Sequence, residues 1–397
     1  MTEFSAQSRF ARNIRRSLGA LLSVALLASC SSFELNPPSQ PPSVADRAQT
    51  VDPREIVALV PDVRAATRLR AGAEAEGFDF REEAALAGLN LRLLRFEFPQ
   101  PLDGAGAIAA LERIEPRSTA GVNHAYRLAQ TTETSLSRFD YANRLLAWPQ
   151  DGCPARVKIG MIDTELDIKA LGARGAQVVT RSFVDPAAGP EQHGTDVAAL
   201  LVDPRRLRGV ELFSAAVVAR STRGIEEAGV DDILKALDWL ASEGVKVVNI
   251  SLSGPYNKLL DRGIDHATGL GMTLVAAVGN DGASARPRYP AALDNVIAVT
   301  AVDANGGVYR NAVRGPHVDI AAPGVDILLP VSGKGRFVTG TSMAVPFVTA
   351  TIASDPNMDG ATTGAILSHL RAAAQDLGSP GPDSTFGAGL LSAPGQC

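Results

Sequence analysis

The sequence has little excess charge and no long hydrophobic run, and each absence excludes a class of protein. Its 397 residues contain 38 Lys and Arg against 43 Asp and Glu, which gives a net charge of −5. No basic helix and no basic patch interleaved with aromatic residues is present, so we expect no nucleic-acid partner. The apolar run from Gly19 to Ala28 is too short to cross a bilayer comfortably. No internal repeat is apparent.

The first thirty residues nevertheless have the pattern of an export signal. Several arginines precede the short apolar run, which predicts a signal peptide over residues 1–29. Leu27-Ala28-Ser29-Cys30 resembles a bacterial lipobox, in which the cysteine becomes the lipidated first residue of the mature protein. We therefore expect a protein exported to the bacterial cell envelope, in the periplasm or on the outer membrane, and held at the membrane by a lipid on Cys30. A Ser/Pro-rich tether is predicted over residues 30–52. The alternative is an ordinary cleaved signal that happens to end in a cysteine.

Cysteine is scarce in the rest of the chain. Only Cys153 and Cys397 remain, and they lie at the two ends of the second half of the sequence. An exported protein meets an oxidising compartment, so a disulfide between these two residues is one hypothesis. Two unrelated thiols are the alternative.

Residues 53–130 predict a small α+β domain. Helices are expected after Asp62 and Asp103, each of which can cap a helix whose apolar residues recur at helical spacing. Four segments are expected to be strands: Glu55 to Val60, Phe78 to Arg81, Leu91 to Phe98 and Gly121 to Leu128. The resulting order, strand-helix-strand-strand-helix-strand, is the ferredoxin-like arrangement, which implies no function by itself.

Residues 131–154 are polar or irregular and predict a linker, after which the pattern changes. Within residues 155–397, helices are expected over Asp231 to Ser242 and Tyr256 to Leu270. Continuous apolar runs predict strands over Val157 to Ile162, Ala215 to Ala219, Val245 to Ile250 and Thr273 to Val278. Runs without alternation suit a parallel sheet buried on both faces. The fold class is therefore α/β, a doubly wound and mainly parallel sheet, in which ligands bind beyond the carboxyl ends of the strands.

Three short segments in this second domain carry side chains that could take part in a chemical reaction. Asp163 ends the first apolar run, and His193 begins a His-Gly-Thr-Asp segment before a helix-like stretch. Ser342 lies in Gly340-Thr341-Ser342-Met343-Ala344-Val345-Pro346, a tight turn into a helix, where unpaired backbone N–H groups favour negative charge. Taken singly, each has an ordinary interpretation: a turn at a strand end, a surface or capping histidine, and a serine N-cap.

Taken in order, these segments resemble the subtilisin-like serine proteases, and the resemblance extends from about Arg156 to Ala393. It implies a catalytic triad of Asp163, His193 and Ser342. Further segments match in the family's order: the oxyanion Asn280 in Ala276-Ala277-Val278-Gly279-Asn280, a substrate-binding strand at Ser251, Leu252, Ser253 and Gly254 to which Gly279 is added, and a closing segment over Asp383 to Leu390.

The resemblance implies a secreted serine endopeptidase that hydrolyses polypeptides through an acyl-enzyme. No cofactor is expected and no metal site is predicted, since no compact acidic loop matches a calcium site, although family members often bind calcium. Three positions depart from the family: Asp196 and Phe347 stand where histidine is usual, and Glu165 where glycine is usual. Asp196 follows His193 by about one helical turn, which predicts a raised histidine pKa.

The small N-terminal domain fits an inhibitory and chaperoning propeptide, which such proteases commonly carry. Its tail would then occupy the substrate cleft, with cleavage between about residues 129 and 152, and the domain would be the intramolecular partner of the protease. A permanent accessory domain is the alternative. Rival functions are a secreted pseudoprotease, a sedolisin-type carboxyl peptidase and a non-catalytic lipoprotein adaptor. The sequence does not predict the substrate, the residue preferred before the scissile bond, or the oligomeric state.

Overall fold

The computed structural model describes residues 52–128, 141–172, 175–185, 189–221, 224–331, 334–395 and 397. All of these residues belong to one compact unit. The predicted signal and Cys30 lie outside the described residues. Within the described part of the chain, no helix has both the length and the apolar character needed to cross a membrane.

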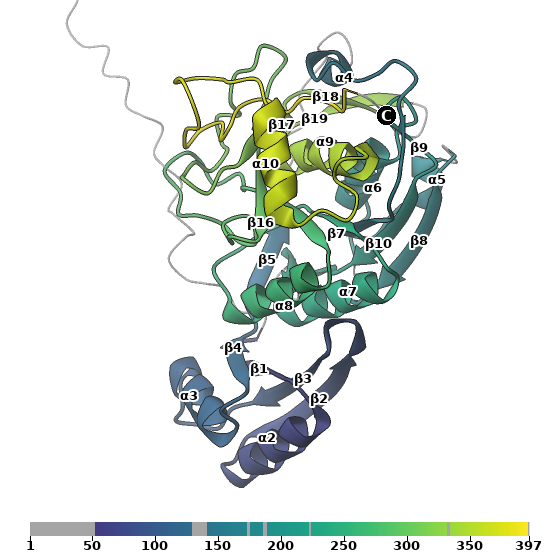
Figure 1. Cartoon of the computed structure of the whole chain (residues 1–397). Coiled ribbons are helices and arrows are strands. Elements are labelled where there is room, and N and C mark those ends of the chain that lie inside the picture. The colour runs from purple at the N-terminus through teal and green to yellow at the C-terminus, as the bar shows by residue number, and fades with distance from the viewer. Residues whose placement is uncertain are drawn as a thin grey trace, which may run out of the picture. The chain divides into compact units, whose positions relative to one another are not determined.

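The segment that follows residue 52 forms a four-stranded antiparallel sheet with two helices (Figure 1). The strands are β1 (Glu55–Val60), β2 (Asp79–Leu86), β3 (Leu91–Glu97) and β4 (Thr119–Val122), and the two helices are α2 (Val63–Ala75) and α3 (Gly104–Ile114). A short 3₁₀ turn, η2 (Ala87–Leu89), joins β2 to β3. The strand order β2-β3-β1-β4 is that of the predicted ferredoxin-like arrangement. Asp62 and Asp103 cap α2 and α3 as expected, because their carboxylates accept backbone N–H groups of the first turn.

The prediction of one closing strand over Gly121 to Leu128 was wrong. The segment divides into β4, which completes this sheet, and β5 (Ala125–Leu128), which pairs with strands of the larger part of the chain. Asn123 and His124 separate the two strands.

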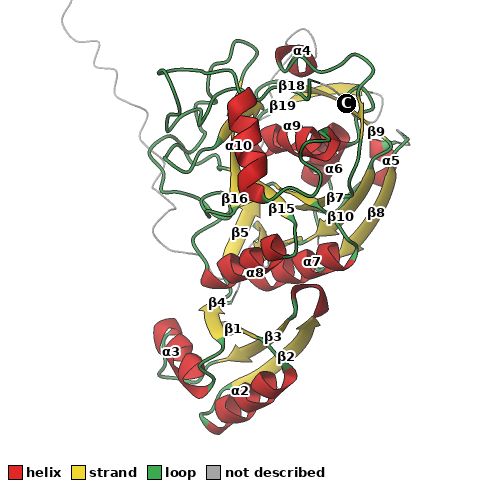
Figure 2. Cartoon of the chain, viewed as in Figure 1, coloured by secondary structure: helices red, strands yellow, loops and turns green. Residues whose placement is uncertain are grey.

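A seven-stranded, fully parallel sheet forms the centre of the larger part, in the order β17-β16-β15-β13-β7-β10-β8 (Figure 2). Its strands are β7 (Ile159–Asp163), β8 (Gln177–Ser182), β10 (Glu211–Ala216), β13 (Val247–Ile250), β15 (Thr273–Ala277), β16 (Val296–Val302) and β17 (Ile320–Pro323). Every residue of β7, β13, β15, β16 and β17 is buried, as helices on both faces of a parallel sheet require. The doubly wound α/β prediction is confirmed.

Helices cover both faces of this sheet, with α7 and α8 on one side and α6 and α9 on the other (Figure 1). The helices are α4 (Ala142–Leu145), α5 (Ile168–Leu171), α6 (Gln192–Leu201), α7 (Val230–Ser242), α8 (Lys258–Gly269), α9 (Thr341–Ser354) and α10 (Thr363–Ala373). All residues of α9 are buried, and its lack of charged residues is typical of a central helix. The helix predicted from Asp231 is α7, and it begins one residue earlier, at Val230.

Shorter strands complete the described part: β6 (Cys153–Pro154), β9 (Leu207–Arg208), β11 (Val218–Arg220), β12 (Glu226–Gly229), β14 (Leu252–Ser253), β18 (Ile327–Val331) and β19 (Lys334–Val338). The strand predicted over Ala215 to Ala219 spans the end of β10 and the start of β11. β18 and β19 form an antiparallel hairpin that leads directly into α9.

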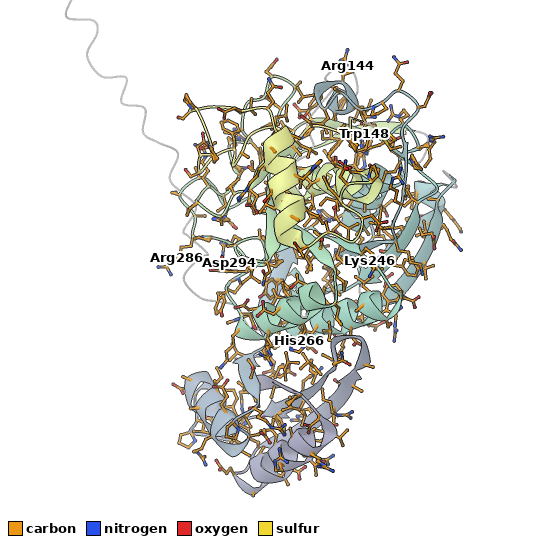
Figure 3. All side chains as sticks on the ribbon, in the orientation of Figure 1. Arg144, Trp148, Lys246, His266, Arg286 and Asp294 are labelled. Carbon is orange, nitrogen blue, oxygen red and sulfur yellow. A yellow bond between two sulfur atoms is a disulfide. The ribbon has the colours of Figure 1, made fainter. Side chains whose placement is uncertain are left out.

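The described end of the predicted linker, residues 141–154, packs into the core instead of crossing the surface. The Tyr141 hydroxyl donates to the carbonyl oxygens of Val302 and Val325, at 3.1 and 2.6 Å. The indole N–H of Trp148, labelled in Figure 3, donates to the Arg206 carbonyl at 2.8 Å. Cys153 forms a disulfide with Cys397, so the two ends of the larger part are joined covalently.

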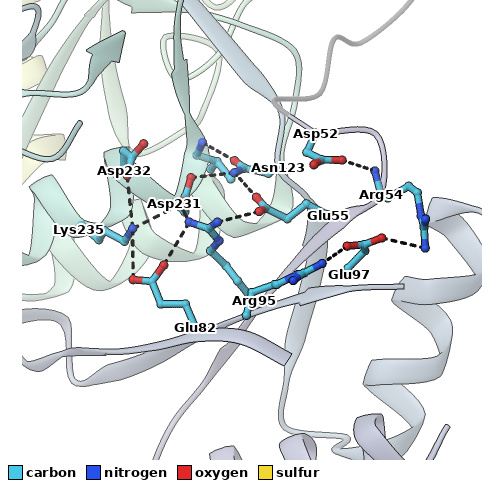
Figure 4. A network of polar contacts seen from close by, with 12 residues as sticks. Asp52, Arg54, Glu55, Glu82, Arg95, Glu97, Asn123, Asp231, Asp232 and Lys235 are labelled. Atoms are coloured by element: carbon cyan, nitrogen blue, oxygen red, sulfur yellow. Dashed lines mark hydrogen bonds and ion pairs between the residues drawn. The ribbon is translucent and has the colours of Figure 1, made fainter. Parts of the chain in front are cut away.

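The N-terminal sheet contacts α7 and α8 through polar groups (Figure 4). Gly229 precedes α7 and offers no side-chain cap, so the Asn123 side chain supplies one by accepting the Val230 N–H at 2.7 Å. Arg95 on β3 lies within 3.1 Å of carboxylate oxygens of Glu55, Glu82 and Asp231.

On α8, His266, labelled in Figure 3, contacts the Leu89 carbonyl through Nδ1 at 3.0 Å. The Leu89 N–H donates to Asp238 on α7 at 3.0 Å. The helix η2 is therefore held by both helices of this face.

Candidate active site

Three neighbouring strands bring the predicted site residues to one edge of the parallel sheet. Ile162 of β7 pairs with Ile250 of β13, and Ile250 pairs with Ala276 of β15, so the three strands end side by side. Asp163 is the last residue of β7, Ser251 follows β13, and Gly279 and Asn280 follow β15 within three residues. This edge is where a doubly wound sheet is expected to bind ligands.

The carboxylate of Asp163 and the imidazole of His193 form a buried hydrogen bond. The distance between Asp163 Oδ1 and His193 Nδ1 is 2.7 Å, and the side chains are 0% and 8% exposed. The same carboxylate oxygen accepts the backbone N–H of Thr164 at 2.7 Å, which fixes its orientation. A carboxylate in this place selects the tautomer with a proton on Nδ1 and leaves Nε2 as the basic nitrogen.

Gly194 allows the first turn of α6 to approach the end of β7. The Gly194 N–H donates to Thr164 Oγ1 at 2.7 Å. A Cβ atom at this position would lie 2.7 Å from both Thr164 O and Thr164 Oγ1, which is closer than side chains tolerate. The glycine after His193 is therefore needed to hold the imidazole against Asp163.

The surroundings of His193 raise its pKa above the ordinary value. Burial by itself favours the neutral ring, but the charge and the hydrogen bond of Asp163 oppose it and, with smaller contributions from Asp196 and Glu226, raise the pKa overall. The charge of Asp196 therefore raises the pKa of His193, as the sequence predicted.

Ser342 lies at the start of α9, directly after Gly340 and Thr341. Ser342 is completely buried, and its backbone carbonyl accepts the Ser251 hydroxyl at 3.4 Å. Asn249 on β13 donates to the same Ser251 hydroxyl at 3.1 Å. The start of α9 is thus anchored to the end of β13, beside the strand that ends in Asp163.

Asn280 is held by the residue before Ser342. Its Oδ1 atom accepts both the backbone N–H and the hydroxyl of Thr341, at 3.1 and 2.8 Å. These two bonds fix which way the amide is turned, with Nδ2 as its donor end. An amide donor and the N–H groups of a helix N-terminus are the groups expected around a developing oxyanion.

The predicted substrate strand pairs with a segment of the chain itself. β5 lies between β12 and β14, antiparallel to both, with Leu128 opposite Leu252 and Tyr126 opposite Ala228. The Tyr126 ring lies against Gly254, where a Cβ would come within 2.5 Å of it, and its hydroxyl donates to the Pro255 carbonyl at 3.2 Å.

Gly279 has a left-handed backbone with φ +97°, and the stem of Arg288 packs over it. The Arg288 guanidinium contacts Asp281 at 2.7 Å, so the two charges flanking this part of the site are paired. This pairing could not be predicted from the sequence, because a loop separates the two residues.

Two of the three departures from the family pattern have visible partners. Asp196 forms an ion pair with Arg336 on β19. Phe347 is completely buried, and the Arg206 guanidinium lies 4.2 Å above its ring. Glu165 is half-buried, and its carbonyl lies near Gly194. Arg336 and Arg206 were not singled out from the sequence, since both lie far along the chain from the residues that they contact.

Within the described residues, no group of three or more His, Cys, Asp or Glu side chains is arranged to hold a metal ion.

Comparisons with known proteins agree with this architecture. The family model described as the subtilase family matches residues 155–389. Subtilisin BL of Lederbergia lenta is 32% identical over 254 residues, which cover 60% of this chain and 89% of that protein. Minor extracellular protease Epr of Bacillus subtilis is 29% identical over 255 residues, 62% of this chain but only 39% of the relative.

The solved structure of fervidolysin from Fervidobacterium pennivorans, a keratinolytic enzyme related to subtilisin, shares the fold. The TM-score is 0.71 at 20% identity, and the match covers 87% of this chain and 61% of that one. With a family match over more than half of its length, the chain belongs to the subtilase family of subtilisin-like serine proteases.

Proposed function

We propose that this chain is a serine endopeptidase that cleaves polypeptides with Ser342 as nucleophile. The observation that carries the proposal is the buried 2.7 Å hydrogen bond between Asp163 and His193, at the sheet edge to which Ser342 is anchored. A serine hydroxyl is a weak nucleophile at neutral pH and needs a neighbouring base. The Asp163–His193 pair supplies a base that is held in one tautomer.

In the proposed reaction, His193 Nε2 takes the Ser342 hydroxyl proton as Oγ bonds to the carbonyl carbon of the substrate. Asp163 stabilises the resulting imidazolium. The C–N bond then breaks, and the imidazolium returns its proton to the leaving amine. A water molecule repeats the two steps on the acyl-enzyme, which releases the acid and restores the Ser342 hydroxyl.

Asn280 and the Ser342 N–H are proposed to bind the oxyanion that forms on the carbonyl oxygen. The contacts from Thr341 to Asn280 Oδ1 support this role, because they orient the amide before substrate binds. Removal of one such donor from a subtilisin lowers turnover by about 10²–10³-fold, and we expect a loss of this size here.

We further propose that the protein is made as a self-inhibited precursor in which residues 53–128 are the inhibitor. The antiparallel pairing of β5 with β12 and β14 supports this, because an extended substrate would pair with the same strand edges. The Asn123 cap on α7 and the Arg95 contact with Asp231 also favour a module fitted to this surface. Cleavage is proposed between residues 129 and 152.

Export and lipidation form the last part of the proposal. The pattern of residues 1–29 favours a signal peptide, and the relative Epr is by name an extracellular protease. A lipid on Cys30 would hold the precursor at the membrane, and cleavage after β5 would release the catalytic part unless the two pieces stay bound. Membrane fractionation of wild type and Ser342→Ala tests this, and equal membrane retention of the full-length chain in both would contradict it.

N-terminal sequencing of the purified protein beside its Ser342→Ala variant tests activity and processing together. We expect the wild-type catalytic part to begin within residues 130–153 and the variant to remain uncut at this place. The same N-terminus in both proteins would contradict self-processing by Ser342.

A further inference from the structure

A buried ion pair lies one helical turn from His193, outside the groups that the proposed mechanism uses. Asp196 Oδ1 on α6 contacts Arg336 Nη2 on β19. The Asp196 side chain is 1% exposed and that of Arg336 is 28% exposed. The carboxylate is therefore withdrawn from water and has a guanidinium as its charged partner.

The pair connects the two segments that carry the base and the nucleophile. His193 and Asp196 are three residues apart on α6, so their side chains lie on the same side of the helix. Arg336 lies on β19, and the chain continues from this strand through Gly340 into Ser342. A contact between Asp196 and Arg336 thus fixes the start of α6 against the strand that leads to the nucleophile.

The end of this strand is itself held firmly. The backbone N–H of Asp326 donates to Thr339 Oγ1 at 2.8 Å, and the Thr339 hydroxyl contacts the Asp326 carboxylate at 3.2 Å. These bonds fasten the start of β18 to the residue that follows β19. Arg336 therefore extends from a hairpin whose open end is held by these two bonds, and a residue that positions an active site needs such support.

Stability alone does not account for a buried pair in this place, since such pairs seldom stabilise more than apolar residues of the same volume. A charged carboxylate beside the imidazole has a direct effect on the ring, however. Burial raises the pKa of Asp196 to about 6, although the Arg336 charge and hydrogen bond lower it. Arg336 thus favours the ionised form of Asp196 and offsets its charge.

The other charged groups around His193 lie on β7, on β12 and in the loop after β7. Asp163 on β7 makes the hydrogen bond, and Glu226 on β12 acts through space. Glu165 follows β7 and is half-buried. All three are acidic, and Glu226 is paired with Arg220 on β11 at 2.8 Å. Arg336 is the cation that balances Asp196.

We propose that Asp196 and Arg336 are positioning residues of the active site, a charge-balanced pair that ties the helix carrying His193 to the strand leading into Ser342. The inference rests on the proposed function, because it assigns roles relative to its base and nucleophile. Neither residue is proposed to contact the substrate.

The test compares the pH dependence of kcat/KM in wild type, Asp196→Asn, Arg336→Met and the double variant. Asp196→Asn leaves the guanidinium uncompensated, so we expect the acid-limb midpoint to fall by roughly 0.5–1 pH unit. Arg336→Met leaves the carboxylate uncompensated, so the midpoint rises, by less because Asp196 partly protonates in the same range. The acid-limb midpoint of the double variant should lie between those of the two single variants. We expect kcat to fall about tenfold in each variant, with KM changed less.

Arg336→Lys is the matched control, because it keeps the charge but loses the planar fork of the guanidinium. We expect Arg336→Lys to have the same acid-limb midpoint as the wild type and a lower kcat. The rate at which a fluorophosphonate labels Ser342, followed against pH, gives the same midpoints without peptide turnover. If Asp196→Asn does not fold, Arg336→Met and Arg336→Lys still test the charge balance.

The possible failures are distinguishable. A folded wild type that is not labelled at Ser342 would contradict the proposed function itself. Labelling of the wild type, together with unchanged midpoints or shifts of the same sign in the two single variants, would overturn the positioning role alone.

Discussion

Gly194 gives a sharp test of how the site is built, because two effects of replacing it with alanine have opposite signs. Gly194 is the third residue of α6, and alanine in a helix is favoured over glycine by about 0.5–1 kcal/mol. The added Cβ, however, would lie 2.7 Å from Thr164 O and Oγ1 and 2.9 Å from Glu165 O. These contacts are about 0.5–0.7 Å shorter than an ordinary contact of 3.4 Å, and two of the three atoms belong to the backbone.

The steric effect should exceed the helical preference. Forcing extra volume into a packed site costs about 1–3 kcal/mol, so Gly194→Ala should lower the free energy of unfolding. Relief of the contact moves the start of α6 away from β7 and takes His193 from its position beside Asp163. Since a displacement of about 1 Å can cost 10²-fold in rate, we expect kcat/KM to fall by about 10–100-fold.

Gly364→Ala is the matched control, because Gly364 lies in α10 and no atom would approach its added Cβ within 4 Å. It should leave kcat/KM unchanged and stabilise the protein by up to about 1 kcal/mol. Peptide hydrolysis and thermal unfolding of both variants provide the measurements. If Gly194→Ala behaves like Gly364→Ala in both assays, our explanation of how α6 approaches β7 is wrong.

Three further predictions concern the oxyanion site, the N-terminal sheet and the disulfide. Asn280→Ala should lower kcat by about 10²–10³-fold with a smaller change in KM, measured by steady-state peptide hydrolysis; a loss below tenfold would remove Asn280 from the oxyanion role. In the uncut Ser342→Ala precursor, Arg95→Met leaves Asp231, 4% exposed, without its guanidinium. Because Arg95 is itself partly exposed, we expect the free energy of opening of β3 to fall by about 2 kcal/mol, which makes hydrogen exchange in this strand about 30-fold faster. Unchanged exchange would show that the contact contributes nothing. Replacement of Cys397 by serine breaks the bond to Cys153 and should lower the free energy of unfolding by about 2–4 kcal/mol, which denaturant titration would reveal; an unchanged midpoint would contradict it.

Local sequence patterns predicted much of the fold because the forces behind them are local. The buried strands lack alternation, and Asp62 and Asp103 reach only three residues to cap their helices. The triad residues could be proposed because their short segments, taken in order, resemble those of the subtilisin-like serine proteases, whereas each segment taken singly has an ordinary interpretation.

Several features that depend on distant partners could not be predicted. The apolar residues of Gly121 to Leu128 suit a strand, but nothing local shows that β5 pairs with another sheet. Asp196 was recognised as unusual, yet its partner Arg336 lies 140 residues further along the chain. The predicted linker contains Trp148, whose burial depends on the Arg206 carbonyl.

The central claim is that Ser342 is a nucleophile activated by His193 and Asp163. Labelling of the folded protein with a fluorophosphonate, followed by peptide mapping, tests it most directly. We predict one covalent adduct, on Ser342, formed at a rate that falls at least 100-fold in His193→Ala and is absent in Ser342→Ala. Folded wild-type protein that carries no adduct, or an equal adduct in Ser342→Ala, would contradict the claim.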